Sequence, residues 1–82
     1  MKVLFFAGLR EAIGRSAESL VLPAGITTVG ALRDHLAARG EPWSALASAR
    51  NLRFAVNQQM VGPEAPVADT DEVAFFPPVT GG

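Results

Sequence analysis

The last ten residues of the sequence contain one group that could take part in chemistry, the C-terminal carboxylate. The segment from Val73 to Gly82 reads Val-Ala-Phe-Phe-Pro-Pro-Val-Thr-Gly-Gly and has no ionisable side chain. Gly81 and Gly82 lack a Cβ atom, so the narrow active site of another protein could close around their backbone. The carboxylate of Gly82 is therefore the candidate reactive group, and we expect it to react inside a partner.

Two prolines separate this end of the chain from the residues before it. Proline cannot donate to a β-ladder and favours an extended backbone, so we expect the last strand to end here and the tail to project from the domain. Six extended residues span roughly 20 Å at ~3.3 Å each. The sequence thus predicts a domain over residues 1–76 and a tail over 77–82 that enters a partner's active site. The predicted tail consists of Pro77, Pro78, Val79, Thr80, Gly81 and Gly82.

The composition argues against several other kinds of function. The 82 residues include no cysteine, which excludes disulfides, thiolate metal sites and a thiol nucleophile. Seven Lys and Arg residues against eight Asp and Glu give a net charge of -1 without a basic block, so nucleic acid is an improbable partner. Hydrophobic residues make up 49%, enough for one folded domain. Without a signal peptide or a long apolar run, we expect a cytoplasmic protein that does not bind membranes.

The hydrophobic pattern predicts strands at both ends of the chain. The run Lys2–Ala7 is typical of a central strand that is covered on both faces. A second strand over 17–22 follows a long loop and is expected to pair with the first as a hairpin. Apolar and other residues alternate over 52–56, which predicts a half-buried strand, and a short strand at Met60–Val61 follows a turn. Glu72–Phe76 is the last predicted strand.

One segment in the middle of the chain has helical spacing. Val29, Leu32 and Leu36 recur at i, i+3 and i+7 between a threonine N-cap and Gly40, which predicts the main helix. A shorter helical turn is expected over 43–49. The order of elements predicts an α+β domain with a mixed sheet of about five strands packed on one main helix. This order fits a β-grasp, in which the first and last strands lie side by side.

The two Phe-Phe pairs predict an apolar surface patch. Because side chains alternate along a strand, Phe5 and Phe75 can meet the helix only if Phe6 and Phe76 point to the other face. These two residues, joined by Met60, would form a patch close to the tail, where a partner could dock. The alternative is that loops cover them, and we favour docking.

Several other residues attract attention but receive no functional role. His35 is a single histidine on a helix, and metal binding needs convergent partners. Trp43 lacks an accompanying basic groove and is interpreted as a core or capping residue. Asp69, Asp71 and Glu72 supply too few ligands for a hard cation, so we interpret them as a solvated turn and predict no metal site.

The segment Asp71–Gly82 closely resembles the C-terminus of the molybdopterin synthase small subunits, a family of ubiquitin-like sulfur carriers. The segments Lys2–Ala7, Thr28–Val29 and Ala55–Gln58 also resemble the family, in the right order and over nearly the full length. One departure is Thr70, where the family often has glycine. A β-branched residue tolerates a positive φ badly, so this turn is expected to differ from the family's.

The resemblance implies a mechanism centred on Gly82. An adenylating partner related to ubiquitin-activating enzymes would use ATP to activate the carboxylate, and a sulfur donor system would convert it into a thiocarboxylate. In the family, the large synthase subunit then transfers this sulfur to cyclic pyranopterin monophosphate during molybdenum cofactor biosynthesis. The family's complex implies a heterotetramer of two small and two large subunits. The chain would bind no cofactor and would not be an enzyme on its own.

Three rival functions stay open. A sulfur carrier of thiamine biosynthesis also has a β-grasp and a diglycine end, although the Phe-Phe-Pro-Pro-Val-Thr segment argues against it. A protein modifier would be activated in the same way and would form isopeptide bonds through Gly82, so that lysine conjugates would reveal it. A plain binding domain with an incidental tail would keep its function after loss of the tail.

Overall fold

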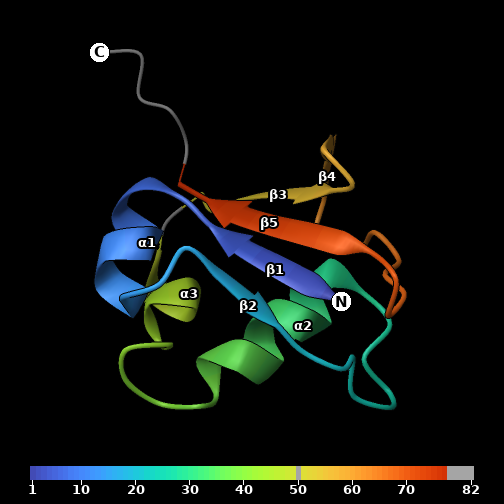
Figure 1. Cartoon of the computed structure of the whole chain (residues 1–82), viewed down its shortest axis with the longest axis horizontal. Helices are drawn as coiled ribbons and strands as arrows, with labels where there is room; N and C mark the ends of the chain where they lie inside the picture. Colours follow the sequence, from blue (N-terminus) through green and yellow to red (C-terminus); the bar gives the residue numbers. More distant parts are fainter. Residues whose placement is uncertain (50, 78–82) are drawn as a thin grey trace.

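The alternating and helical segments of the sequence fold into one mixed sheet with helices packed against it (Figure 1). The computed structural model describes residues 1–49 and 51–77. The described strands are β1 (Lys2–Phe5), β2 (Ala17–Ser19), β3 (Arg53–Val56), β4 (Gln59–Val61) and β5 (Glu72–Phe76). The described helices are α1 (Ala7–Ile13), α2 (Val29–Ala37) and α3 (Ala45–Ser48).

The sheet has the strand order β2-β1-β5-β3-β4, which places the first and last strands of the chain side by side. β1 and β5 are parallel and in a register that pairs Phe5 with Phe75. All the other pairings in the sheet, β1 with β2, β3 with β5 and β3 with β4, are antiparallel. The predicted β-grasp and its mixed five-stranded sheet are therefore confirmed.

The core lies between the sheet and the helices, which cover one face of the sheet in Figure 1. Phe5 and Phe75 are stacked with ring centroids 6.2 Å apart, and Phe54 meets Phe75 edge-on at 5.8 Å. Leu32 and Leu36 of α2 are fully buried on the same side. Each such side chain stabilises the fold by roughly 1.5–3 kcal/mol relative to an exposed one.

The structure confirms both predicted helical segments. Thr28 caps α2, because its Oγ1 accepts a hydrogen bond from the Ala31 N–H at 3.2 Å. Gly40 has a φ of +88° and follows the helix, as expected of a residue that ends one. In the second segment, α3 buries Leu46, and Trp43 packs edge-on against Phe5 at 5.7 Å.

Two predictions about the start of the chain are wrong. The residues expected to form a long loop after the first strand include α1, which buries Leu9 and Ile13 and ends at Gly14, where φ is +87°. The first strand was also expected to be covered on both faces and to reach Ala7. It ends at Phe5, and on its outer face Lys2 is exposed and Leu4 is only half-buried.

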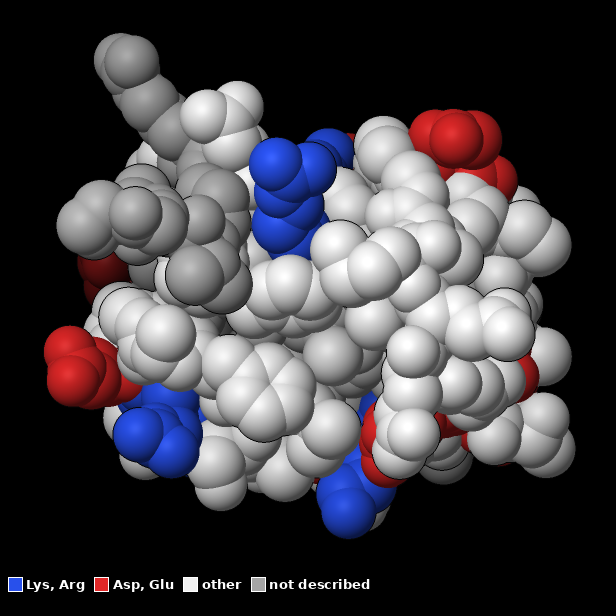
Figure 2. Space-filling view, turned by 90° about the horizontal axis from the view of Figure 1, so that it is seen from above, with Lys and Arg blue, Asp and Glu red and all other residues white. Residues whose placement is uncertain are grey.

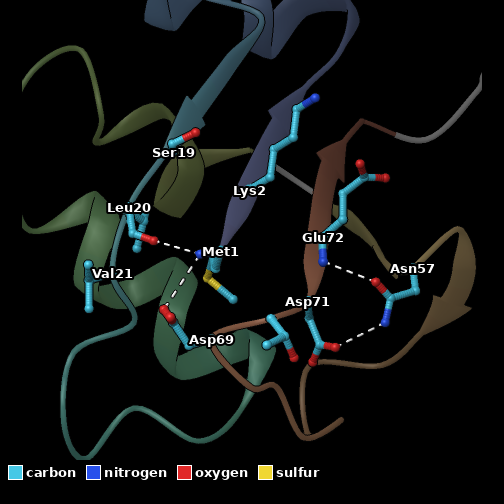
Figure 3. A pocket seen from close by; sticks show the side chains of 10 residues that line it. Met1, Lys2, Ser19, Leu20, Val21, Asn57, Asp69, Asp71 and Glu72 are labelled. Atoms are coloured by element: carbon cyan, nitrogen blue, oxygen red, sulfur yellow. Dashed lines mark hydrogen bonds and ion pairs between the residues drawn. The ribbon is translucent and has the colours of Figure 1, made fainter.

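The Asn57 side chain connects the turn between β3 and β4 to the start of β5 by hydrogen bonds (Figure 3). Its side-chain amide donates to Asp71 at 3.0 Å and accepts from the Glu72 N–H at 3.0 Å. The second Asp71 oxygen accepts from the Ala68 N–H at 2.8 Å. The Asn57 amide and this N–H lower the pKa of the Asp71 carboxyl from its ordinary value of 3.8.

Asp69 makes a similar connection to the N-terminal part of the chain. Its carboxylate accepts a hydrogen bond from the Leu22 N–H at 2.7 Å and lies 3.5 Å from the Met1 ammonium, which donates to the Leu20 carbonyl (Figure 3). The Leu22 N–H lowers the pKa of Asp69, and the ammonium adds to this effect. The carboxylates of Asp69 and Asp71 thus connect the turn before β5 to other segments of the chain, whereas Glu72 takes part through its backbone N–H. Within residues 1–49 and 51–77, no group of His, Cys, Asp and Glu side chains is arranged to hold a metal.

We predict that the stability gained from Asp71 depends on pH. A carboxyl whose pKa is lowered by folding stabilises the protein above its ordinary pKa, and this contribution disappears as the pH falls through the lower, folded-state pKa. The variant Asp71→Asn should therefore unfold at lower urea concentration than wild type at about pH 7, and the difference should narrow towards about pH 3. Urea midpoints measured across this range test it.

Glu11→Gln is the control for this experiment. Glu11 is exposed on α1, and its carboxylate forms no hydrogen bond or ion pair with any described residue. The urea midpoint of this variant should follow wild type at every pH. If the difference in urea midpoint between wild type and Asp71→Asn stays constant from neutral to acidic pH, the Asp71 carboxylate does not provide the predicted pH-dependent stability.

Candidate functional site

The predicted reactive end of the chain lies mostly outside the described residues. This applies to the tail residues Pro78, Val79, Thr80, Gly81 and Gly82, including the candidate reactive carboxylate. Of the predicted tail, Pro77 is described and is half-buried directly after the end of β5. The site can therefore be built from β5 and the elements beside it.

The predicted apolar patch forms on the outer face of the sheet, opposite the helices. The alternation along β1 and β5 buries Phe5 and Phe75 and turns Phe6 and Phe76 outward. The outward rings meet edge-on with centroids 6.4 Å apart. Phe6 is 44% exposed and Met60 of β4 is 62% exposed, while Phe76 is half-buried. The predicted exposure of Phe6 and Met60 is thus confirmed, and the described loops do not cover them.

These three residues line one cleft of about 320 Å³. Its lining consists of Leu4, Phe6, Ala55, Gln58, Met60, Glu72, Ala74 and Phe76. Most of these side chains are apolar. Seen from above in Figure 2, the middle of this side of the molecule is uncharged, and charged side chains lie around it. We call this surface, defined by the cleft lining, the outer apolar face.

The sequence-based prediction missed part of this face. Leu4 and Ala74 stand two positions before Phe6 and Phe76, so the same alternation places them on the outer side. Ala55 lies opposite Ala74 and Met60 in the sheet, which makes it the floor between the strands. The period of two could have identified Leu4 and Ala74, but the position of Ala55 depends on the order of the strands.

The outer apolar face adjoins the end of β5, where the tail begins. Phe76 lines the cleft and immediately precedes Pro77, so the chain leaves the sheet at the edge of the outer apolar face. Within residues 1–49 and 51–77, no polar or charged side chain is buried. The described domain therefore offers a binding surface and contains no enclosed set of catalytic groups.

Two of the residues that received no functional role, His35 and Trp43, lie away from this face, whereas Glu72 is part of its lining. His35 is exposed on α2, on the helical side of the sheet. Trp43 is half-buried and stacks below the guanidinium of Arg39, which lies 4.5 Å from its ring. Among the described helices, none is long and apolar enough to cross a membrane.

Known proteins are similar to this chain over its whole sequence, including the tail residues. The ThiS family model matches residues 3–82. The molybdopterin synthase sulfur carrier subunit of Escherichia coli is 49% identical over 82 residues, which cover 100% of this chain and 99% of the relative. The subunit of the same name from Haemophilus influenzae is 43% identical over the same shares of both chains.

A solved structure shows the same fold. The crystal structure of small archaeal modifier protein 1 from Haloferax volcanii has a TM-score of 0.76 and 27% identity, covering 96% of this chain and 97% of that protein. Sequence and fold agree over nearly the whole length of these proteins. The chain therefore belongs to the ThiS family.

Proposed function

We propose that this protein is the sulfur carrier subunit of a molybdopterin synthase, and that Gly82 carries the sulfur. The observation that supports this most strongly is the 49% identity over the full length to a protein of that name. The family match also reaches residue 82, so it includes the uncharged segment that ends in Gly81 and Gly82.

The proposed chemistry follows from the poor reactivity of a carboxylate. A C-terminal carboxyl group has a pKa near ~3.5, so at neutral pH it is a resonance-stabilised anion and a weak electrophile. An activating partner attaches AMP from ATP to the Gly82 carboxylate and releases pyrophosphate. The terminal sulfur of a persulfide, supplied by a donor system, then attacks the acyl carbon and displaces AMP, so that a C–S bond replaces the bond between this carbon and the phosphate oxygen. A thiol of the donor system cleaves the remaining S–S bond by disulfide exchange and so supplies the two electrons. The product is a thiocarboxylate, which is a soft nucleophile of low basicity.

The second half of the proposal concerns sulfur transfer. The tail, Pro77 to Gly82, enters the active site of the large synthase subunit and donates its sulfur to cyclic pyranopterin monophosphate. In each transfer the sulfur forms a C–S bond to the pterin, and water then cleaves its bond to the Gly82 carbonyl carbon, which restores the carboxylate. Two such transfers supply both sulfur atoms of molybdopterin. The groups that promote catalysis belong to the partner, because the tail offers only the Thr80 hydroxyl and backbone amides. In this proposal the chain binds no cofactor itself, ATP is used by the activating partner, and the steps take place in the cytoplasm.

The outer apolar face is the proposed docking surface for the large subunit. Phe6, Met60 and Phe76 present apolar area beside the start of the tail, and aromatic residues and methionine are enriched in protein interfaces. A partner that covers this face is positioned to receive residues 77–82. The division into a docking domain over 1–76 and a reactive tail over 77–82 is part of the proposal.

A second candidate function has support from the fold comparison. A protein of the same fold, at 27% identity, is named a small archaeal modifier protein. Such a function would use the same activation of Gly82 but would end in an isopeptide bond to a lysine. Lysine conjugates of this chain in cell extract would favour it, and a free thiocarboxylate would favour the carrier.

We predict that deletion of Gly82, or extension by one residue beyond it, abolishes sulfur transfer. The reason is that both changes move the carboxyl group by about one residue length, roughly 3.3 Å, relative to the partner's catalytic groups. The measurement is conversion of cyclic pyranopterin monophosphate by the reconstituted synthase and activating system.

The melting temperature of these tail variants is the control, and it should stay close to that of wild type. A variant without Gly82 that still supports pterin conversion would contradict the proposed function. A large fall in melting temperature would instead show that the tail is part of the fold.

We also predict that Phe76→Glu folds but binds the large subunit at least about a hundredfold more weakly. Burial of an unpaired carboxylate in an apolar interface costs several kcal/mol, and about 1.4 kcal/mol corresponds to tenfold in affinity. Circular dichroism and binding titrations on the same preparations check both parts of this prediction.

Phe75→Glu is the matched control, because Phe75 is fully buried under the helices and its replacement should unfold the domain. If Phe76→Glu folds and binds with wild-type affinity, the outer apolar face is not the docking surface. If it unfolds like Phe75→Glu, the half-buried ring of Phe76 belongs to the core instead.

A further inference from the structure

Arg53 brings a positive charge to the outer side of the sheet, at the end where the chain leaves β5. The register of β3 and β5 pairs Arg53 with Phe76 and Phe54 with Phe75. Phe54 and Phe75 are buried under the helices, so alternation places Arg53 on the same side as Phe76. Side chains directly opposite each other in an antiparallel pair have Cβ atoms about 4.5–5.5 Å apart. A partner that covers Phe76 therefore also covers Arg53.

The Arg53 residue is exposed, and its side chain forms no ion pair or hydrogen bond with any other described residue. Three other arginines are used within the domain: Arg15 and Arg39 both contact Glu18, and Arg33 contacts Asp34. The guanidinium of Arg53 is thus available for an interaction with another molecule.

The surface around Arg53 is continuous with the outer apolar face. Arg53 lines a groove of about 350 Å³ together with Leu52, Phe54, Met60, Val61, Gly62 and Pro63. Met60 lines this groove and also the cleft of the outer apolar face, so the two depressions share a wall. A protein surface seated on Phe6, Met60 and Phe76 would reach the guanidinium.

The opposite end of the same side carries charges of both signs. The β1–β5 register pairs Lys2 with Glu72, so a positive and a negative side chain lie next to each other there. Their fields largely cancel at a distance. Arg53 has no such oppositely charged neighbour among the described residues, so the described part of this end of the face carries a positive charge.

Covering this guanidinium without a partner would oppose docking. Burial of an unpaired charge is costly, whereas a guanidinium paired with a carboxylate forms two parallel, charge-assisted hydrogen bonds. We propose that Arg53 strengthens docking by pairing with an Asp or Glu side chain of the protein that binds the outer apolar face. This inference rests on the proposed function, in which that protein is the large synthase subunit.

The test compares Arg53→Gln and Arg53→Glu with wild type in binding titrations against the purified large subunit, at low and at high NaCl. Arg53→Gln should weaken binding by about tenfold or more, because the partner's carboxylate loses its charged donor. Arg53→Glu should weaken it further through repulsion between like charges. The affinity of wild type should fall with salt, and that of Arg53→Gln should fall less steeply.

Arg15→Gln and Arg15→Glu are the matched controls, because they change the net charge equally at another exposed arginine, which lies over Trp43 on the helical side of the sheet and does not line the Arg53 groove. They should bind like wild type. All four variants should keep the wild-type melting temperature within a few degrees, which separates pairing with a partner from an effect on folding.

If Arg53→Gln binds the large subunit with the same affinity and the same salt dependence as wild type, the inference is overturned and the proposed function stays intact. Tighter binding by Arg53→Gln would also overturn it, since the arginine would then be an uncompensated charge in the interface. If wild type itself does not bind the large subunit, the proposed function and this inference both fail.

Discussion

The parallel pairing of β1 with β5 is the constraint on which the rest of the structure depends. It joins the two ends of the chain at the middle of the sheet and sets Phe5 against Phe75 in the core. Because side chains alternate along a strand, the same register turns Phe6 and Phe76 to the open side. A slip of one residue in either strand would put an outward ring into the core and a core ring into solvent. The core and the proposed docking surface are thus two results of one pairing.

This arrangement suits a protein whose proposed reactive group is part of its backbone. The sequence contains no cysteine, and the described domain buries no polar or charged side chain. What the domain supplies is a rigid surface from which β5 leads directly through Phe76 to Pro77. The helices stabilise the sheet from the other side, and the hydrogen bonds of Asn57, Asp69 and Asp71 fix the far end of β5. In the proposed function, these contacts fix the place at which β5 leads into the tail.

The parts of the fold predicted from the sequence are those with a strong local period. Val29, Leu32 and Leu36 identified α2, and the alternation around Phe54 identified β3, because each pattern belongs to one element. The helix α1 was missed, since it has seven residues and includes Gly8, so its stability comes from the burial of Leu9 and Ile13 in the folded protein. Similarly, the contribution of Ala55 to the docking surface depends on which strands become neighbours. The exposure of Phe6 and Met60 could be predicted, but the strand order was needed to bring Arg53 beside Phe76.

The central claim is that Gly82 carries sulfur. Intact mass spectrometry of the protein purified after co-expression with its activating enzyme, in sulfur-replete cells, tests this most directly. The account predicts a fraction of molecules heavier by the exchange of one oxygen atom for one sulfur atom. Fragmentation should locate this change at Gly82, and the same exchange should be absent when the activating enzyme is left out. An unmodified mass in the presence of an active activating enzyme, or a mass change located elsewhere in the chain, would contradict the account.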